Sequence, residues 1–235
     1  MLVPGRNPVL EALRSQHRVS EIFLEYDIRV DPKIAEIMDI AKQKNIRIIN
    51  QNASQLAKIA GEEPHQGVIA KVNLEAEKFS DKILHDRPGL YVYVREAQYE
   101  HNLGAIIRTA EVAGVAGVIV APNQDLTGVV ARISMGAIFH IPIYSGSLFP
   151  TIKIFRHDDL PVFALEINGT VTLFESDLGK DGLLIIGGED RSISQEIALQ
   201  CTQLIKIPQF GKVNSLNMSV AAALAMYEHV RKRDA

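Results

Sequence analysis

Short apolar runs alternate with helix-like segments along most of this chain, and this alternation is the strongest constraint on its fold. Strand-like runs rich in apolar residues, at 90–94, 117–121, 183–186 and 204–207, are separated by segments with helix-forming patterns. The run at 183–186 contains no polar residue, which is typical of a strand buried on both faces of a parallel sheet. The alternation predicts an α/β fold with a parallel sheet covered by helices on both sides.

The organisation of the chain indicates two parts. Residues 1–73 contain an α/β pattern of their own, and the pattern resumes at residue 89. The stretch between them is charged, lacks a long apolar run and ends in an Arg-Pro-Gly sequence, which is typical of a connection. We predict a small domain at 1–73, a linker at 74–88 and a larger domain at 89–235. A surface loop within a single domain is the alternative for the linker.

Three polar residues are predicted to mark helix starts. Asn7 precedes a proline and would cap a helix over residues 8–16. Asn102 would cap a helix that ends near residue 113. Ser215 could cap the long final helix, which we expect to continue to residue 231.

Composition excludes several classes of protein. The 235 residues are 47% apolar, carry a net charge of −3 and include one cysteine, Cys201. A disordered chain, a disulfide framework and a cysteine-based zinc cluster are therefore excluded, and nucleic-acid binding by bulk positive charge is disfavoured. No run approaches the roughly 18 apolar residues of a membrane span, and the N-terminus lacks a signal-peptide pattern. We expect a cytoplasmic protein without membrane contact.

The common catalytic motifs are absent. The sequence contains no dinucleotide-binding G-x-G-x-x-G after a first strand, no P-loop, no H-E-x-x-H and no G-x-S-x-G. The triplet at residues 157–159, His-Asp-Asp, could bind a metal but is more typical of a solvated turn, so we expect no metal site.

Three stretches are unusual for plain α/β packing. In the first, Gly104 lies one helical turn before Arg108, so that a ligand could approach the backbone there. Spacing alone favours an exposed arginine whose stem packs on apolar neighbours. In the second, Gly187 and Gly188 follow the buried run at 183–186, and ligands of open α/β sheets bind at such strand exits. An ordinary turn remains the alternative.

The third stretch, 204–223, begins with the strand-like run at 204–207. Ser215, Asn217 and Ser219 open a helix lined with alanines. Three polar side chains exceed the needs of one helix cap, and an alanine face permits close packing against another helix. A cap followed by a core helix explains the pattern equally well.

Together the three stretches resemble the SpoU (TrmH-like) family of RNA ribose 2′-O-methyltransferases, within the SPOUT superfamily. The resemblance covers about residues 89–231. Its motifs are carried by Asn102, Gly104 and Arg108, then by the Gly-Gly-Glu at 187–189, then by the Ile-Pro at 207–208 and the Ser-Leu-Asn at 215–217.

The opening of the chain carries a second resemblance. Residues 4–13, PGRNPVLEAL, look like the start of the substrate-binding domain, similar to ribosomal protein L30e, of the 23S rRNA guanosine 2′-O-methyltransferase branch. This favours rRNA over tRNA as the substrate. Arg6, Arg14 and Arg18 are the candidates for a local RNA-binding patch.

The resemblance implies a fold, a cofactor and a set of roles. It implies a C-terminal trefoil knot that binds S-adenosylmethionine against the backbone near Gly187, Ile207 and Leu216, and a homodimer that completes the site across its interface. Its implied catalytic residues are Asn102, Arg108, Glu189, Ser215 and Asn217.

The chemistry limits what Arg108 can do. A guanidinium is very hard to deprotonate, so we expect Arg108 to hold the neighbouring phosphate and stabilise developing alkoxide charge rather than act as a simple base. Asn102 would orient the ribose or Arg108, and Glu189 would fix Arg108 or a loop amide. Ser215 and Asn217 would hold the loop and the edge of the cofactor.

The favoured function is S-adenosylmethionine-dependent methylation of a ribose 2′-hydroxyl in RNA, with 23S rRNA as the expected substrate. The alternatives are a tRNA methyltransferase, a non-catalytic RNA-binding protein that kept the fold, and a small-molecule α/β enzyme. Absence of the usual phosphate loops counts against the last.

Overall fold

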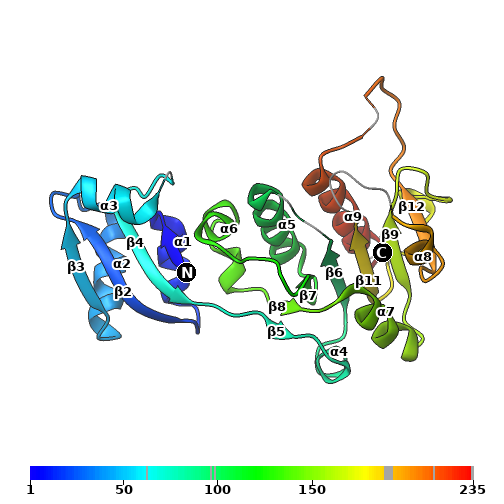
Figure 1. Cartoon of the computed structure of the whole chain (residues 1–235), viewed down its shortest axis with the longest axis horizontal. Helices are drawn as coiled ribbons and strands as arrows, with labels where there is room; N and C mark the ends of the chain where they lie inside the picture. The colour runs from blue at the N-terminus through cyan, green and yellow to red at the C-terminus, as the bar shows by residue number, and fades with distance from the viewer. Residues whose placement is uncertain (62, 96, 98, 188–192, 214, 234–235) are drawn as a thin grey trace. The chain divides into compact units, whose positions relative to one another are not determined.

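A computed structural model describes the whole chain except residues 62, 96, 98, 188–192, 214 and 234–235 (Figure 1). The chain divides into two compact units. The first combines residues 1–75 with 125–140, and the second combines residues 76–124 with 141–235. In the described part of the chain, no helix is both long and apolar enough to cross a membrane.

The first unit is a four-stranded sheet with helices packed against it. The strand order is β1-β4-β2-β3, in which only β2 and β3 run parallel. Its elements are β1 (Leu2–Pro4), α1 (Arg6–Arg14), β2 (Arg18–Glu25), α2 (Pro32–Gln43), β3 (Arg47–Gln51), α3 (Ala53–Ala60), β4 (Val68–Asn73), α6 (Gly128–Ile133) and the short 3-10 helix η1 (Ala137–Phe139).

Helix α6 completes the first unit from a distant part of the sequence. It packs on β1 so closely that a Cβ atom on Gly128 would collide with the carbonyl oxygen of Leu2. Val130 and Ala131 are fully buried there, and Arg132 forms an ion pair with Glu63. Residues 1–73 are therefore not expected to fold in isolation, because part of their apolar surface is covered by residues 125–140.

The second unit is an eight-stranded sheet in which every pairing is parallel. The strand order is β10-β12-β9-β11-β6-β7-β8-β5. Its elements are β5 (Glu77–Lys78), α4 (Asp81–Asp86), β6 (Leu90–Val94), α5 (Glu100–Ala113), β7 (Gly117–Val120), β8 (Ile143–Ser145), α7 (Leu148–His157), β9 (Val162–Leu165), β10 (Val171–Thr172), η2 (Leu173–Glu175), β11 (Gly182–Ile186), α8 (Gln195–Ala198), β12 (Gln203–Lys206) and α9 (Met218–Arg233).

The centre of this sheet confirms the expected α/β fold. Every residue of β6, β7, β9 and β11 is buried. Strand β11, which contains the apolar run at 183–186, lies between β6 and β9, so it is paired on both sides. The trefoil knot stays a prediction, because strand order alone does not define the path of a knot.

The stretch expected to be a linker, 74–88, is structured. It contains β5, which pairs with β8, and α4. Phe79 and Leu84 are buried in the apolar core of the second unit, where the Phe79 ring stacks on Phe155 with 5.7 Å between ring centroids. The boundaries 1–73, 74–88 and 89–235 remain predictions for family domains, and the compact units follow different limits.

Two predicted helix caps were wrong, by two residues in α1 and by three residues in α5. Helix α1 begins at Arg6, because Gly5 adopts a φ of 102° that favours glycine and turns the chain into the helix. Asn7 therefore lies inside the helix, where its Oδ1 accepts a hydrogen bond from Lys33. Helix α5 begins at Glu100, so Asn102 lies in its first turn rather than at its cap.

The third predicted start was wrong as well. Helix α9 begins at Met218, and Asn217 rather than Ser215 occupies the capping position. The Asn217 Oδ1 accepts a hydrogen bond from the Ser219 amide at 2.8 Å, and its carbonyl accepts one from Ala221 at 2.9 Å. Asparagine side chains satisfy otherwise unpaired amides in this way at helix N-termini.

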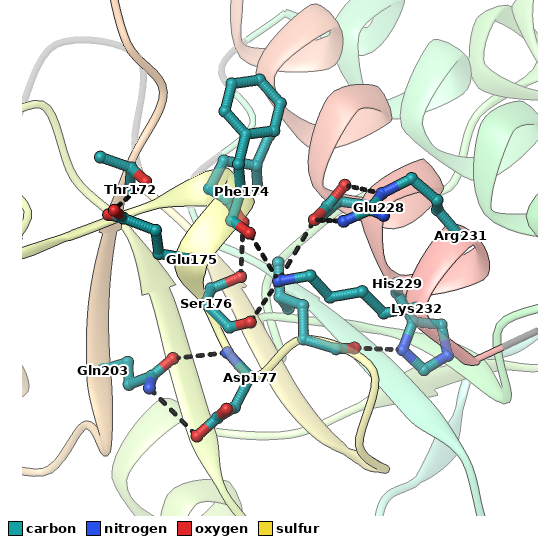
Figure 2. A network of polar contacts seen from close by, with 12 residues as sticks. Thr172, Phe174, Glu175, Ser176, Asp177, Gln203, Glu228, His229, Arg231 and Lys232 are labelled. Atoms are coloured by element: carbon teal, nitrogen blue, oxygen red, sulfur yellow. Dashed lines mark hydrogen bonds and ion pairs between the residues drawn. The ribbon is translucent and has the colours of Figure 1, made fainter. Parts of the chain in front are cut away.

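The last turns of α9 are anchored to the segment around η2 by a polar network (Figure 2). Lys232 donates to the carbonyl of Phe174 at 3.1 Å and to that of Ser176. Glu228 accepts hydrogen bonds from Arg231 and lies 3.2 Å from Lys232. The buried His229 ring donates to the carbonyl of Leu178.

Candidate functional site

Three neighbouring parallel strands, β12, β9 and β11, end at one edge of the sheet of the second unit, and a cavity lies there. Its volume is about 370 Å³. Its lining residues are Tyr99, Asn102, Leu165, Glu166, Ile167, Ile186, Gly187, Ile205, Ile207, Gln209, Ser215, Leu216, Asn217, Met218 and Ala221. Cavities at the carboxyl ends of parallel strands are the usual ligand sites of α/β sheets.

Two asparagines from different motifs meet at this cavity. The Nδ2 of Asn217 donates a hydrogen bond of 3.1 Å to the Oδ1 of Asn102, although the two residues are 115 positions apart. Asn102 comes from the first turn of α5, and Asn217 caps α9. Because Asn217 also accepts hydrogen bonds from the Ser219 amide and hydroxyl, its amide group has a defined orientation.

The structure brings six of the eight predicted catalytic and cofactor residues to one cavity. They are Asn102, Gly187, Ile207, Ser215, Leu216 and Asn217. Glu189, together with Gly188, lies outside the described residues. The roles assigned to all of these residues remain predictions.

Arg108 does not line the cavity. It is exposed on α5, and among the described residues it forms no ion pair. Ala105 and Val112 lie one turn away on either side, on the same helix face. Gly104, one helical turn before Arg108, is buried.

The predicted RNA-binding arginines differ in their surroundings. Arg6 forms an ion pair with Asp31, and Arg14 forms ion pairs with Glu11 and Glu36. Arg18, the first residue of β2, is exposed and forms no ion pair within the described part of the chain. Of the three, Arg18 has the guanidinium least neutralised by neighbours.

Some lining residues were missed at the sequence level, and Glu166 is the most informative. It directly follows β9, just as Gly187 follows β11. The apolar run at 162–165 precedes Glu166 as the run at 183–186 precedes Gly187, so the same sequence signal, a position just after a buried strand, marks both residues as ligand-site candidates. Tyr99 and Gln209 carried no such signal.

The lining is suited to a ligand with an apolar body and polar edges. Isoleucines from three strand ends and Leu216 supply apolar walls, whereas Glu166, Gln209 and the two asparagines supply acceptors and donors. Cysteine chemistry is disfavoured, because burial raises the pKa of the Cys201 thiol to about 11 and the thiolate is therefore scarce at pH 7.

Two family models match nearly the whole chain. The SpoU rRNA Methylase family matches residues 89–227, and the model for RNA 2′-O ribose methyltransferase substrate binding matches residues 2–77. The chain belongs to the SpoU methylase family. The resemblance proposed from the sequence motifs is thereby confirmed.

Relatives and solved structures agree with this membership. A Staphylococcus saprophyticus protein assigned to the TrmH family of tRNA/rRNA methyltransferases is 33% identical, over 100% of this chain and 96% of its own length. The SpoU methyltransferase AviRb of Streptomyces viridochromogenes, solved with AdoMet, shares the fold with a TM-score of 0.86 at 24% identity, over 100% of this chain and 90% of its own. An AdoMet-bound rRNA methyltransferase of Sinorhizobium meliloti has a TM-score of 0.82 to this chain at 24% identity. The match covers 98% of this chain and 86% of the S. meliloti chain.

Proposed function

We propose that this SpoU-family protein transfers a methyl group from S-adenosylmethionine to a ribose 2′-hydroxyl of structured RNA, with a 23S rRNA guanosine as the target. The cavity at the ends of β9, β11 and β12, with the Asn102–Asn217 pair at its lining, carries this proposal. The match of residues 2–77 to the ribose methyltransferase substrate-binding family supports the ribose hydroxyl as acceptor.

Coverage favours rRNA over tRNA. The rRNA methyltransferase of S. meliloti covers 98% of this chain, including the first unit. The tRNA-modifying TrmH/SpoU enzyme of A. aeolicus covers only 66% at 26% identity. The third of this chain that the match to the tRNA enzyme leaves uncovered would then supply contacts specific to another RNA.

The lining residues fit the cofactor. A cavity of about 370 Å³ is within the usual range for a nucleotide-sized ligand. The backbone at Gly187, Ile207 and Leu216 would hold it, with isoleucine side chains packing against its base. When bound, S-adenosylmethionine supplies a methyl group on a positively charged sulfur, which is already activated for transfer, so no metal is required.

The chain's own task is to align the ribose hydroxyl and to stabilise charge on its oxygen. Arg108 would bind the adjacent phosphate and stabilise the alkoxide that develops as the hydroxyl proton is lost. Asn102, oriented by Asn217, would position the ribose or Arg108. Glu189 would fix Arg108 or a loop amide, and Ser215 would hold the loop that follows Ile207.

A groove between α5 and α9 supports a homodimer. It is lined by small and apolar side chains, namely Ala105, Thr109, Ser219, Val220, Ala223, Leu224 and Tyr227. Val220, Leu224 and Tyr227 are large and between 43% and 50% exposed, which is unusual for three neighbouring apolar side chains on one helix. Arg108 lies next to Thr109 in the sequence of α5, and Thr109 lines this groove. A second copy seated here would therefore bring Arg108 of the partner subunit near the interface.

The chain is expected to sediment as a dimer at low micromolar concentration. Leu224→Glu should convert it to a monomer, because two charged side chains would be buried in the symmetric interface. Sedimentation velocity measures both, with Val213→Glu, an exposed apolar position outside the groove, as the matched control. A monomeric mass for an active wild-type sample would contradict the dimer.

The first unit is proposed to bind the RNA, with Arg18 as a phosphate contact. Arg18→Ala should weaken RNA binding and lower the slope of log affinity against log salt concentration by about one. Cofactor affinity should not change. Filter binding at several salt concentrations measures this, with Arg47→Ala, an exposed arginine at the start of β3, as control. An equal loss of RNA affinity in both variants would show that RNA binding depends on the net charge of the protein and not on Arg18 in particular.

The proposed function is tested by mapping ribose 2′-O-methylation in total RNA from cells with and without this protein. Loss of one 23S rRNA guanosine mark, restored by the purified protein with S-adenosylmethionine, is the expected result. Loss of a tRNA mark alone would refute the substrate. Cofactor and RNA binding without methylation of any RNA would identify a non-catalytic RNA-binding protein.

A further inference from the structure

Glu166 lies at the centre of the cavity edge of the sheet. It is the first residue after β9, which is flanked by β12 and β11, and the ends of all three strands contribute to the cavity lining. Its amide donates a hydrogen bond of 2.9 Å to the carbonyl of Ile205, so the backbone is still paired with the neighbouring segment. The side chain is half-buried, which is uncommon for a glutamate in a largely apolar lining.

The turn that follows holds Glu166 in place. The amide of Gly169 donates a hydrogen bond of 3.0 Å to the carbonyl of Glu166, which closes the turn. A Cβ atom on Gly169 would lie 2.6 Å from backbone atoms of Ile205 and Lys206, so only glycine allows the turn to pack directly on β12. The carboxylate is therefore presented from a fixed backbone rather than from a free loop.

The carboxylate is only partly used by the protein. Its Oε1 accepts a hydrogen bond of 3.0 Å from the Ile167 amide, and its Oε2 accepts one of 2.7 Å from the Ile193 amide. No lysine, arginine or histidine among the described residues forms an ion pair with Glu166. An ionised carboxylate offers about four acceptor positions, so two remain for a ligand in the cavity that it lines.

We propose that Glu166 accepts hydrogen bonds from the vicinal ribose hydroxyls of the bound nucleoside cofactor; this rests on the proposed function. The positions adjoining Glu166 are Leu165, Ile167 and Ile205, whose apolar side chains suit the nucleoside rather than the charged amino-acid end. A vicinal diol provides two donors to one acceptor-only group, as at acidic strand ends in other nucleotide-binding sheets. Glu166 is thus a specificity residue that selects a ribonucleoside.

The test is calorimetric and needs no RNA. Glu166→Gln keeps the size of the side chain and one acceptor but replaces the other with an amide that cannot accept. It should weaken binding of S-adenosylhomocysteine and of 5′-methylthioadenosine by about tenfold each, because charge-assisted hydrogen bonds are lost from both. Glu175→Gln is the matched control, since Glu175 accepts from Thr172 at 2.7 Å but does not line the cavity. The affinities of Glu175→Gln for both nucleosides should stay within twofold of those of the wild type.

Comparing the two ligands shows whether Glu166 binds the ribose or the amino-acid group of S-adenosylhomocysteine. Methylthioadenosine keeps the diol but lacks the ammonium group, so a loss confined to S-adenosylhomocysteine would show that Glu166 binds the ammonium and would overturn the inference. Unchanged affinity for both, in a variant with a wild-type unfolding temperature, would overturn it as well.

If Glu166→Gln fails to fold, the ligand is changed instead of the protein. Wild-type protein should bind 2′-deoxy S-adenosylhomocysteine about tenfold more weakly than the parent ligand, and equal affinity would overturn the inference. If wild-type protein binds none of these nucleosides, the proposed function fails, and the inference fails with it.

Discussion

Replacement of Arg108 with alanine is expected to lower the single-turnover rate of RNA methylation by about 100-fold or more, with S-adenosylmethionine affinity unchanged. The expected loss is that of one preorganised group that stabilises charge in the transition state. Affinity for the cofactor should persist, because Arg108 does not line the cavity. Single-turnover methylation and cofactor titration on the same purified variant measure the two quantities.

Two further variants sharpen this prediction. Arg108→Lys should recover little activity, because an ammonium group lacks the planar fork that binds phosphate in two places. Arg156→Ala removes an exposed arginine of α7, whose side chain donates to Gln200, and should leave the rate unchanged. A near-normal rate for Arg108→Ala would show that Arg108 only packs on its neighbours. A fall in cofactor affinity that matches the fall in rate would place it in the cofactor site.

The sequence predicted those parts of the fold that are encoded by residues close together along the chain. The buried run at 183–186 predicted a central parallel strand because only apolar side chains can face helices on both sides. Gly187, Ile207 and Leu216 were assigned to the cofactor through the family resemblance, and all three line one cavity. Strand exits and helix starts are local in sequence, and the sheet brings them together.

The parts that sequence missed depend on contacts between distant residues. Nothing in the sequence of α6 indicates that Gly128 packs on β1 rather than on the segments next to it along the chain. The strand β5 is two residues long and charged, so its pairing with β8 has no periodic signal. The start of α9 was misplaced because Ser215 and Asn217 are both good caps, and the partner that distinguishes them, Asn102, lies in another helix.

Glu228→Gln is expected to lower the free energy of unfolding by about 2 kcal/mol at pH 7. The Glu228 side chain is only 5% exposed and accepts hydrogen bonds of 2.8 and 2.7 Å from Arg231, with Lys232 at 3.2 Å (Figure 2). Breaking a buried pair costs about 3–5 kcal/mol, but Arg231 is 61% exposed and can be rehydrated, which reduces the loss.

The same substitution should change how stability depends on pH. Hydrogen bonds from Arg231, followed by those from Lys232, hold the pKa of Glu228 below its usual value of 4.5. A lowered pKa in the folded state means that the stabilisation is fully present above pH 4.5 and is lost as pH falls through the lowered pKa. The difference in unfolding free energy between wild type and Glu228→Gln should therefore be constant near neutrality and shrink in acid.

Urea unfolding at several pH values measures this difference, and Glu111→Gln, an exposed glutamate of α5, is the matched control. A difference that stays constant down to pH 3 would mean that shape and packing, rather than the charge of Glu228, account for its effect. A shrinking difference would instead assign the anchoring of α9 to this carboxylate. Because α9 begins at the cap formed by Asn217, the network at its far end would then stabilise the helix that carries one side of the cavity proposed to hold the cofactor.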